Sequence, residues 1–418
     1  MDKRQFIKRT IGLFSVLFSP NILANNSRVF FLKKKFSKLS WEDIRNDYSL
    51  HEDFINLESG YYNIVPKPTL DSFYSHVNNL NIEGSYFMRN KMKDRSKIIN
   101  KKLSKFLGCP EDELVVTRNT TESLDLIISG YPWKKNDHVI FAHQDYGSMK
   151  DMFYQVSKRY GINYDIVSIP NDPKDDQEII NIYKNKINDK TKMIFVSHMI
   201  NITGQILPIK KICKMAHQHQ VEVLVDGAHC VGHFSFKISD LGCDYYGSSL
   251  HKWLATPLGL GILYVAKKKI SKIWPLLASN IKSDNDIMRF DHKGTNPFHN
   301  QMAIENALEY IDKIGLSRKE SRLRDLHTYV KKKLKHNKKV YFNSPSDSKR
   351  YCGILNLGIK KISPEKLEKI LFDKYKIFTV SINEKGVKGC RFTPNVFTNY
   401  KELDILISSI NKITNEIS

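Results

Sequence analysis

Apolar and polar residues alternate along the chain in two recurring patterns, one typical of buried strands and one typical of helices. Five short apolar runs have the length of buried strands, and they lie near residues 114–117, 139–142, 193–197, 221–225 and 260–265. The stretches between them space their apolar residues as one face of a helix does, as at 120–130, 147–160 and 209–220. Strands that alternate with helices predict an α/β fold with a mostly parallel sheet.

A different order begins near residue 300. Helical segments at 301–314 and 318–335 precede strands near 352–358 and 389–393 and a closing helix at 400–415. This order predicts a bridge into a smaller α+β domain. We therefore expect a leader at 1–24, an N-terminal segment at 25–65, a large domain at 66–298, and a bridging helix with a small C-terminal domain at 299–418.

Most residues that could take part in chemistry follow the fourth apolar run, at 221–225. Val-Leu-Val-Asp-Gly-Ala-His at 223–229 puts a carboxylate behind a buried strand, where ligand-facing groups lie in parallel sheets. Ser-Ser-Leu-His-Lys at 248–252 adds an amine and hydroxyls. Taken singly, an Asp in this position is usually a helix cap, and a Lys is usually a solvated group on the surface. Together they indicate a pyridoxal phosphate (PLP) site, with Lys252 for the aldehyde, Asp226 for the pyridine nitrogen and Ser249 for the phosphate.

From about Asn56 to its C-terminus, the chain resembles the class V aminotransferases of PLP fold type I. The likeness is to the branch that holds isopenicillin N epimerase-like proteins and cysteine desulfurases, whose Ser-x-His-Lys signature His251 and Lys252 match. It implies that His229 lies near the phenolic oxygen of the cofactor. It also implies that Lys252 carries the Cα proton once substrate has displaced it, and that the protein is a homodimer.

The turn before the predicted helix at 120–130 resembles the phosphate-binding turn of this family. Thr120 and Thr121 stand where backbone N–H groups, hydroxyls and the helix dipole attract an anion. An ordinary Thr N-cap is the alternative interpretation. By the same resemblance, Thr295 belongs to a loop that reaches the phosphate of the partner subunit.

Two further segments match positions around the cofactor ring. Tyr146 stands where the family stacks an aromatic or His side chain on the pyridine ring, and His143 is the weaker candidate. The alternatives are a tyrosine at the core edge and a loop histidine. Asn201, in a His-x-x-Asn-x-x-Gly pattern, matches the contact to the phenolic oxygen, although Asn before a Gly turn is also ordinary turn chemistry.

Substrate contacts are suggested at both ends of the chain. Arg391, in Gly-Cys-Arg-Phe-Thr-Pro at 389–394, resembles the Arg that clamps the substrate carboxylate with two parallel donors. Gly60 and Tyr61 resemble a substrate-side turn near the N-terminus.

The cysteines argue against persulfide chemistry. Cysteine desulfurases carry a nucleophilic Cys shortly before the carboxylate-binding Arg, whereas residues 380–388 contain none. Cys390 adjoins Arg391 in a predicted strand, so the two side chains are expected on opposite faces. The other five cysteines, at 109, 213, 230, 243 and 352, lack a Cys-x-x-Cys pair, and we assign no metal.

The first residues resemble an export signal. Lys3-Arg-Gln-Phe-Ile-Lys8 is similar to a twin-arginine motif with Lys in place of the first Arg, and a short apolar stretch follows at 11–23. This predicts an exported, periplasmic protein that uses the twin-arginine export machinery. The alternative is the amphipathic N-terminal helix of a cytoplasmic enzyme.

The net charge of +22 raises the question of nucleic-acid binding, but no nucleic-acid module is recognisable and the lysines are spread as on solvated faces. We predict a PLP-dependent transferase, an aminotransferase first, that acts at Cα of an amino acid or of an amino-acid unit in a peptide-like substrate. Epimerase chemistry of the isopenicillin N epimerase kind, or C–S or β-lyase chemistry, is the alternative. A non-catalytic basic binding protein is the alternative from another class.

Overall fold

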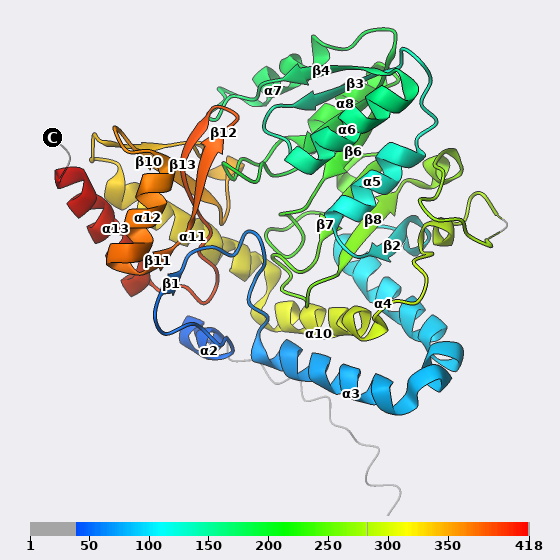
Figure 1. The fold of residues 1–418 in the computed structure, drawn as a ribbon, viewed down its shortest axis with the longest axis horizontal. Coiled ribbons are helices and arrows are strands. Elements are labelled where there is room, and N and C mark those ends of the chain that lie inside the picture. Colours follow the sequence, from blue (N-terminus) through cyan, green and yellow to red (C-terminus); the bar gives the residue numbers. More distant parts are fainter. Residues whose placement is uncertain (1–38, 282, 417–418) are drawn as a thin grey trace, which may run out of the picture. The chain divides into compact units, whose positions relative to one another are not determined.

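The structure is a computed structural model that describes residues 39–281 and 283–416 (Figure 1). The predicted leader at 1–24 lies outside the described residues, as does the predicted N-terminal segment up to residue 38. One compact unit of the chain begins at Ser40. None of the described helices is both long and apolar enough to cross a lipid bilayer.

A mostly parallel sheet of seven described strands has the order β2-β8-β7-β6-β5-β3-β4. Only β8 runs against its neighbours β2 and β7, so the predicted α/β sheet is confirmed. The strands are β2 (Leu114–Thr117), β3 (His138–Ala142), β4 (Asn163–Val167), β5 (Thr191–Ser197), β6 (Glu222–Asp226), β7 (Tyr245–Ser249) and β8 (Gly261–Val265).

Helices cover both faces of this sheet, because the strands send alternate apolar side chains into two separate cores. Leu224 of β6 belongs to the core beneath α5 and α6, whereas its neighbours Val223 and Val225 belong to the core of the opposite face. The helices are α3 (Lys67–Asn90), α4 (Met92–Leu107), α5 (Thr120–Gly130), α6 (Gly147–Tyr160), α7 (Asp176–Lys184), α8 (Ile209–Gln218), α9 (Ile238–Leu241) and α10 (Phe298–Ile314).

A smaller antiparallel sheet follows in the C-terminal part, with the order β12-β13-β10-β9. Its core contains Leu355, Leu357 and Phe392 together with Leu326 of α11 and Leu371 of α12. The elements are α11 (Leu316–Leu334), β9 (Val340–Phe342), β10 (Leu355–Ile359), α12 (Pro364–Tyr375), β11 (Ile377–Phe378), β12 (Val380–Glu384), β13 (Val387–Phe392) and α13 (Tyr400–Asn415).

The N-terminal part of the described chain joins this C-terminal region. After α2 (Trp41–Asn46), the short strand β1 (Ile55–Asn56) pairs in parallel with β11. Thr393 continues the link, because its backbone N–H donates to the Leu57 carbonyl at 2.7 Å. This pairing, which no pattern in the sequence had indicated, brings the segment around Gly60 next to β13.

The strand predicted near 352–358 begins later than expected, at Leu355. The backbone N–H of Gly353 donates to Nε2 of His233 at 2.8 Å instead of to a neighbouring strand. A tertiary contact therefore replaces sheet pairing at the start of the apolar run.

Gly227, directly after β6, is required by the packing of the sheet. A Cβ there would lie 2.1 Å from the ring carbon Cζ and the hydroxyl of the fully buried Tyr246, whereas a Cβ on Gly147 would meet nothing within 4 Å. We predict that Gly227→Ala lowers the free energy of unfolding by about 1–3 kcal/mol, the usual cost of overpacking. Gly147→Ala should leave it within about 1 kcal/mol of the wild type. Urea unfolding followed by circular dichroism would measure both, and equal midpoints for the two variants would contradict this assignment.

Candidate active site

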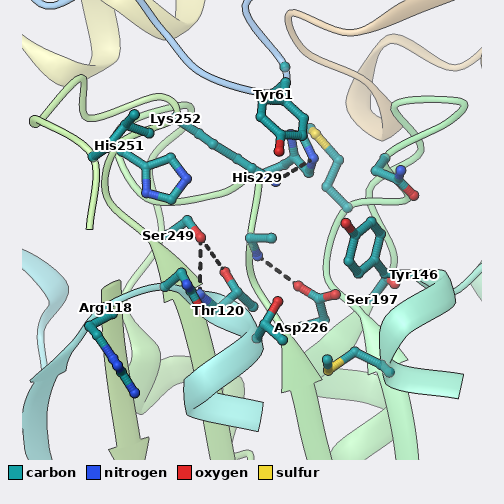
Figure 2. Close-up of a pocket in the computed structure, with 18 of the residues that line it drawn as sticks. Tyr61, Arg118, Thr120, Tyr146, Ser197, Asp226, His229, Ser249, His251 and Lys252 are labelled. Carbon is teal, nitrogen blue, oxygen red and sulfur yellow. Dashed lines mark hydrogen bonds between the residues drawn. The ribbon is translucent and has the colours of Figure 1, made fainter. Parts of the chain in front are cut away.

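A cavity of about 320 Å³ opens at the carboxyl ends of the parallel strands (Figure 2). It gathers residues from widely separated parts of the chain. Apart from Thr295 and the weaker candidate His143, every predicted site residue lines it, namely Gly60, Tyr61, Thr120, Thr121, Tyr146, Asn201, Asp226, His229, Ser249, His251, Lys252 and Arg391. The cavity lies where parallel α/β sheets bind ligands.

Asp226 ends the central strand β6 and is buried. Its Oδ1 accepts a hydrogen bond from the backbone N–H of Ala228 at 2.9 Å. Burial raises the pKa of this carboxyl group, and the Ala228 hydrogen bond and the nearby charge of Lys252 oppose that rise. Asp226 is therefore a carboxylate held away from water, which suits a protonated ring nitrogen.

Lys252 follows β7 and reaches the same cavity. Burial lowers the pKa of its amine to about 8; the negative charge of Asp226 opposes this shift, and the guanidinium of Arg391 adds to it. Its Nζ lies 3.2 Å from Nε2 of His229. A larger fraction of this amine is therefore uncharged near neutral pH than of an ordinary lysine, and the uncharged form is the nucleophile for an aldehyde.

The start of α5 and the end of β7 meet at one side of the cavity. Oγ of Ser249 accepts the backbone N–H of Thr120 at 3.0 Å and lies 2.7 Å from the Thr120 hydroxyl. Asn119 caps the helix by accepting the N–H of Glu122 at 2.8 Å. Hydroxyls and a helix N-terminus in one place fit a phosphate group. Arg118 also lines this side, and only its position in the predicted phosphate turn signalled it.

Tyr146 lies across the cavity from this turn, at the N-cap of α6 (Figure 2). The buried Asp145 fixes its turn, because its carboxylate accepts the hydroxyl of Ser197 and the N–H of Ala142, both at 2.6 Å. Burial raises the pKa of Asp145 to about 6. The side chain of Tyr146 is 44% exposed, so its ring is available to a cofactor in the cavity.

Arg391 comes from β13 and is buried against Glu58, which the sequence analysis did not single out. Its Nη2 lies 2.7 Å and its Nε 3.4 Å from the carboxylate of Glu58, and its Nη1 donates to the Asn201 carbonyl at 3.2 Å. A Cβ on Gly60 would lie 3.0 Å from Nη2. Glu58 thus holds the guanidinium in place while Arg391 still lines the cavity.

Thr295 lies away from the cavity of its own chain. It is exposed in the loop before α10. Its assigned role needs a second subunit and stays a prediction. His143 is exposed and likewise does not line the cavity.

None of the cysteines, all of which lie in the described residues, lines the cavity. Cys390 is buried on the α12 side of its strand, where its thiol donates to the Pro364 carbonyl at 3.5 Å. This agrees with the expectation that it faces away from Arg391. Cys230, close to His229 in sequence, is fully buried, and burial raises the pKa of its thiol well above the ordinary value.

The lowered pKa of Lys252 gives a direct test of the site. We predict that the rate at which the full-length apoprotein takes up PLP rises with pH up to about 8 and then levels off, because only the uncharged amine attacks the aldehyde. An amine of ordinary pKa would keep gaining rate up to about pH 10. The visible absorption of the bound cofactor measures this rate. A profile without a plateau near pH 8 would contradict the buried environment.

The described chain matches the family model "Aminotransferase class-V" over residues 67–386. The isopenicillin N epimerase of Streptomyces clavuligerus is 21% identical over 90% of this chain and 99% of its own length. A probable cysteine desulfurase of Halalkalibacterium halodurans is 24% identical over 72% of this chain and 76% of its own length. The apo structure of a cysteine desulfurase from Thermococcus onnurineus, 21% identical, superposes with a TM-score of 0.80 over 90% of this chain and 98% of that one. With its sheet and its cavity, the chain belongs to the class V aminotransferase family of PLP-dependent fold type I enzymes.

Proposed function

We propose that this enzyme removes the proton from Cα of an amino acid, or of an amino-acid unit in a peptide-like molecule, and returns a proton to the opposite face of Cα, as an epimerase does. The sequence alone favours transamination. Relatives named isopenicillin N epimerase and cysteine desulfurase now favour the alternatives. The observation that carries the proposal is a half-buried amine in one cavity with a buried carboxylate and a buried guanidinium, and none of the cysteines lines that cavity.

Each charged residue of the site has a role that follows from its surroundings. PLP, when bound, supplies a conjugated ring that takes up the electron pair left at Cα. Lys252 accepts the proton at Nζ, because a pKa of about 8 lets the amine act as a base near neutral pH. Inversion then requires a proton to reach the opposite face of Cα, so that proton comes from a donor other than Lys252. Asp226, which is buried, supplies a negative charge for the pyridine nitrogen of the cofactor. Arg391 offers donors to the substrate carboxylate, and Glu58 fixes their direction.

The absence of a cavity thiol separates this proposal from desulfurase chemistry. Sulfur transfer to the enzyme needs an accessible thiolate. Cys390, the cysteine closest in sequence to Arg391, is buried, and burial raises the pKa of its thiol. This observation supports the proposal of epimerase-like chemistry.

We also propose that the working form is a homodimer. Several large apolar side chains of α3 are exposed in the single chain, and a second copy would cover them. Ile82 is 73% exposed, and Tyr74 and Tyr86 are about 60% exposed. Tyr61 at the cavity rim is 78% exposed, so a second subunit would also change the access to the site.

Isotope exchange separates the candidate reactions. We predict that PLP-loaded enzyme in heavy water, given amino acids and envelope-derived peptides, incorporates deuterium at Cα with inversion of configuration and without build-up of pyridoxamine phosphate. Lys252→Ala should lower the exchange rate at least about 100-fold, the scale of a lost general base. Lys97→Ala, an exposed lysine on α4, should not change it.

Other outcomes of this experiment would reject epimerisation. Build-up of pyridoxamine phosphate would identify a transaminase, and release of a β-substituent would identify a lyase. Exchange that survives in Lys252→Ala would remove the proposed proton carrier.

Residues 1–24 are proposed to be an export signal, on the evidence of their sequence alone. We predict that N-terminal sequencing of the protein from the producing cell gives a mature chain that starts shortly after Ala24. Protein that keeps Met1 and stays in the cytosolic fraction would overturn the proposal. A Lys3-Arg4→Gln-Gln variant that is still exported would exclude the twin-arginine route.

A further inference from the structure

Trp253, the residue after Lys252, makes a directed contact with His229. The indole is fully buried, and its Nε1–H donates to Nδ1 of His229 at 3.3 Å. The other ring nitrogen of His229, Nε2, lies 3.2 Å from Nζ of Lys252. The imidazole therefore stands between an indole that only donates and the amine that binds the cofactor.

This arrangement decides where the imidazole carries its proton. A tryptophan N–H has no acceptor capacity, so Nδ1 of His229 must offer a lone pair. The ring is then neutral and its proton is on Nε2, which faces Lys252. An N–H at that position donates to the lone pair of an uncharged amine, whereas it would repel an ammonium group.

Other buried contacts hold Trp253 in this position. Its ring stacks on His233, with centroids 3.6 Å apart and planes 17° from parallel. His233 accepts the backbone N–H of Gly353 at Nε2, so its Nδ1–H donates to the His229 carbonyl at 2.7 Å. A Cβ on Gly353 would lie 3.0 Å from the Trp253 ring, which explains the glycine. Lys319 of α11 is buried and donates to the Trp253 carbonyl.

We propose that Trp253 is a positioning residue that keeps His229 neutral, with its proton on Nε2, and thereby favours the uncharged form of Lys252. The proposal rests on Lys252 being the PLP-binding amine, as in the proposed function, but it does not depend on what happens at Cα. It is consistent with burial, which lowers the pKa of His229 well below its ordinary value.

The charged and titratable groups around Lys252 come from several elements. They are Asp226 of β6, Cys230 and His229 of the following turn, His251 beside it, Arg391 of β13 and Glu58 after β1. Removal of the indole N–H leaves all of them in place. A change in the titration of Lys252 in such a variant therefore reports on His229.

The test compares the pH dependence of PLP uptake by the full-length apoprotein. In Trp253→Phe, the aromatic ring is kept and the donor is lost, so Nε2 of His229 becomes free to accept from the ammonium form of Lys252. We expect the midpoint of the uptake profile to move up by about one pH unit, the size of one hydrogen bond. Trp133→Phe is the matched control, because Trp133 is also buried but donates to the Ile128 carbonyl, away from the cavity. It should leave the midpoint unchanged.

A second comparison isolates the imidazole. In a His229→Phe background, Trp253→Phe should no longer raise the midpoint, since no ring nitrogen remains to change roles. A midpoint in Trp253→Phe equal to the wild type would overturn the proposal, as would an equal upward shift in both backgrounds. Wild-type protein that takes up no PLP at Lys252 would instead refute the proposed function.

A measurement on the wild type covers the case in which Trp253→Phe does not fold. Nitrogen-15 spectra of histidine-labelled apoprotein, with the His229 signals assigned by their loss in His229→Gln, report the tautomer directly. We expect a neutral ring protonated at Nε2. A ring protonated at Nδ1, or at both nitrogens near neutral pH, would overturn the proposal.

Discussion

The site depends on keeping an amine and a carboxylate out of water at the carboxyl end of one sheet. An isolated buried charge costs several kcal/mol, and proteins reduce this cost by pairing the charge or by shifting its pKa. Lys252 shows the shift, with burial lowering its pKa to about 8. Asp226 shows the opposite shift, with burial raising its pKa. The same burial that makes the charged form of Lys252 unfavourable leaves part of its amine uncharged and reactive near neutral pH.

The surrounding structure provides the burial. The parallel strands β5, β6 and β7 end at the cavity with Ser197, Asp226 and Ser249, and helices cover both faces of the sheet. The small sheet then adds Arg391 from β13, and β1 brings Glu58 to it through its pairing with β11. Residues from both ends of the chain therefore complete one cavity, which requires the two sheets to be folded together.

The sequence predicted those features whose signal is local. Buried strands such as β3 and β6 are visible as apolar runs, and the motifs around Asp226 and Lys252 identified the cofactor. The strand β4 was missed because its first residues, Asn163 and Tyr164, are exposed at the sheet edge, and β7 because Gly247, Ser248 and Ser249 interrupt its apolar character. Glu58, Asp145 and Trp253 could not be placed in advance, because their partners are brought to them by tertiary contacts. The role of Thr295 stays a prediction, since it needs a second chain.

The central claim is that Lys252 is the one amine that holds PLP. The most direct measurement is borohydride reduction of the PLP-loaded protein, followed by proteolysis and mass spectrometry of the pyridoxyl-labelled peptide. We expect a single stoichiometric label on Lys252 and none on Lys319, a buried lysine that donates to the Trp253 carbonyl. A label on another lysine, or labels spread over many lysines with Lys252 unmodified, would contradict the assignment on which the mechanism rests.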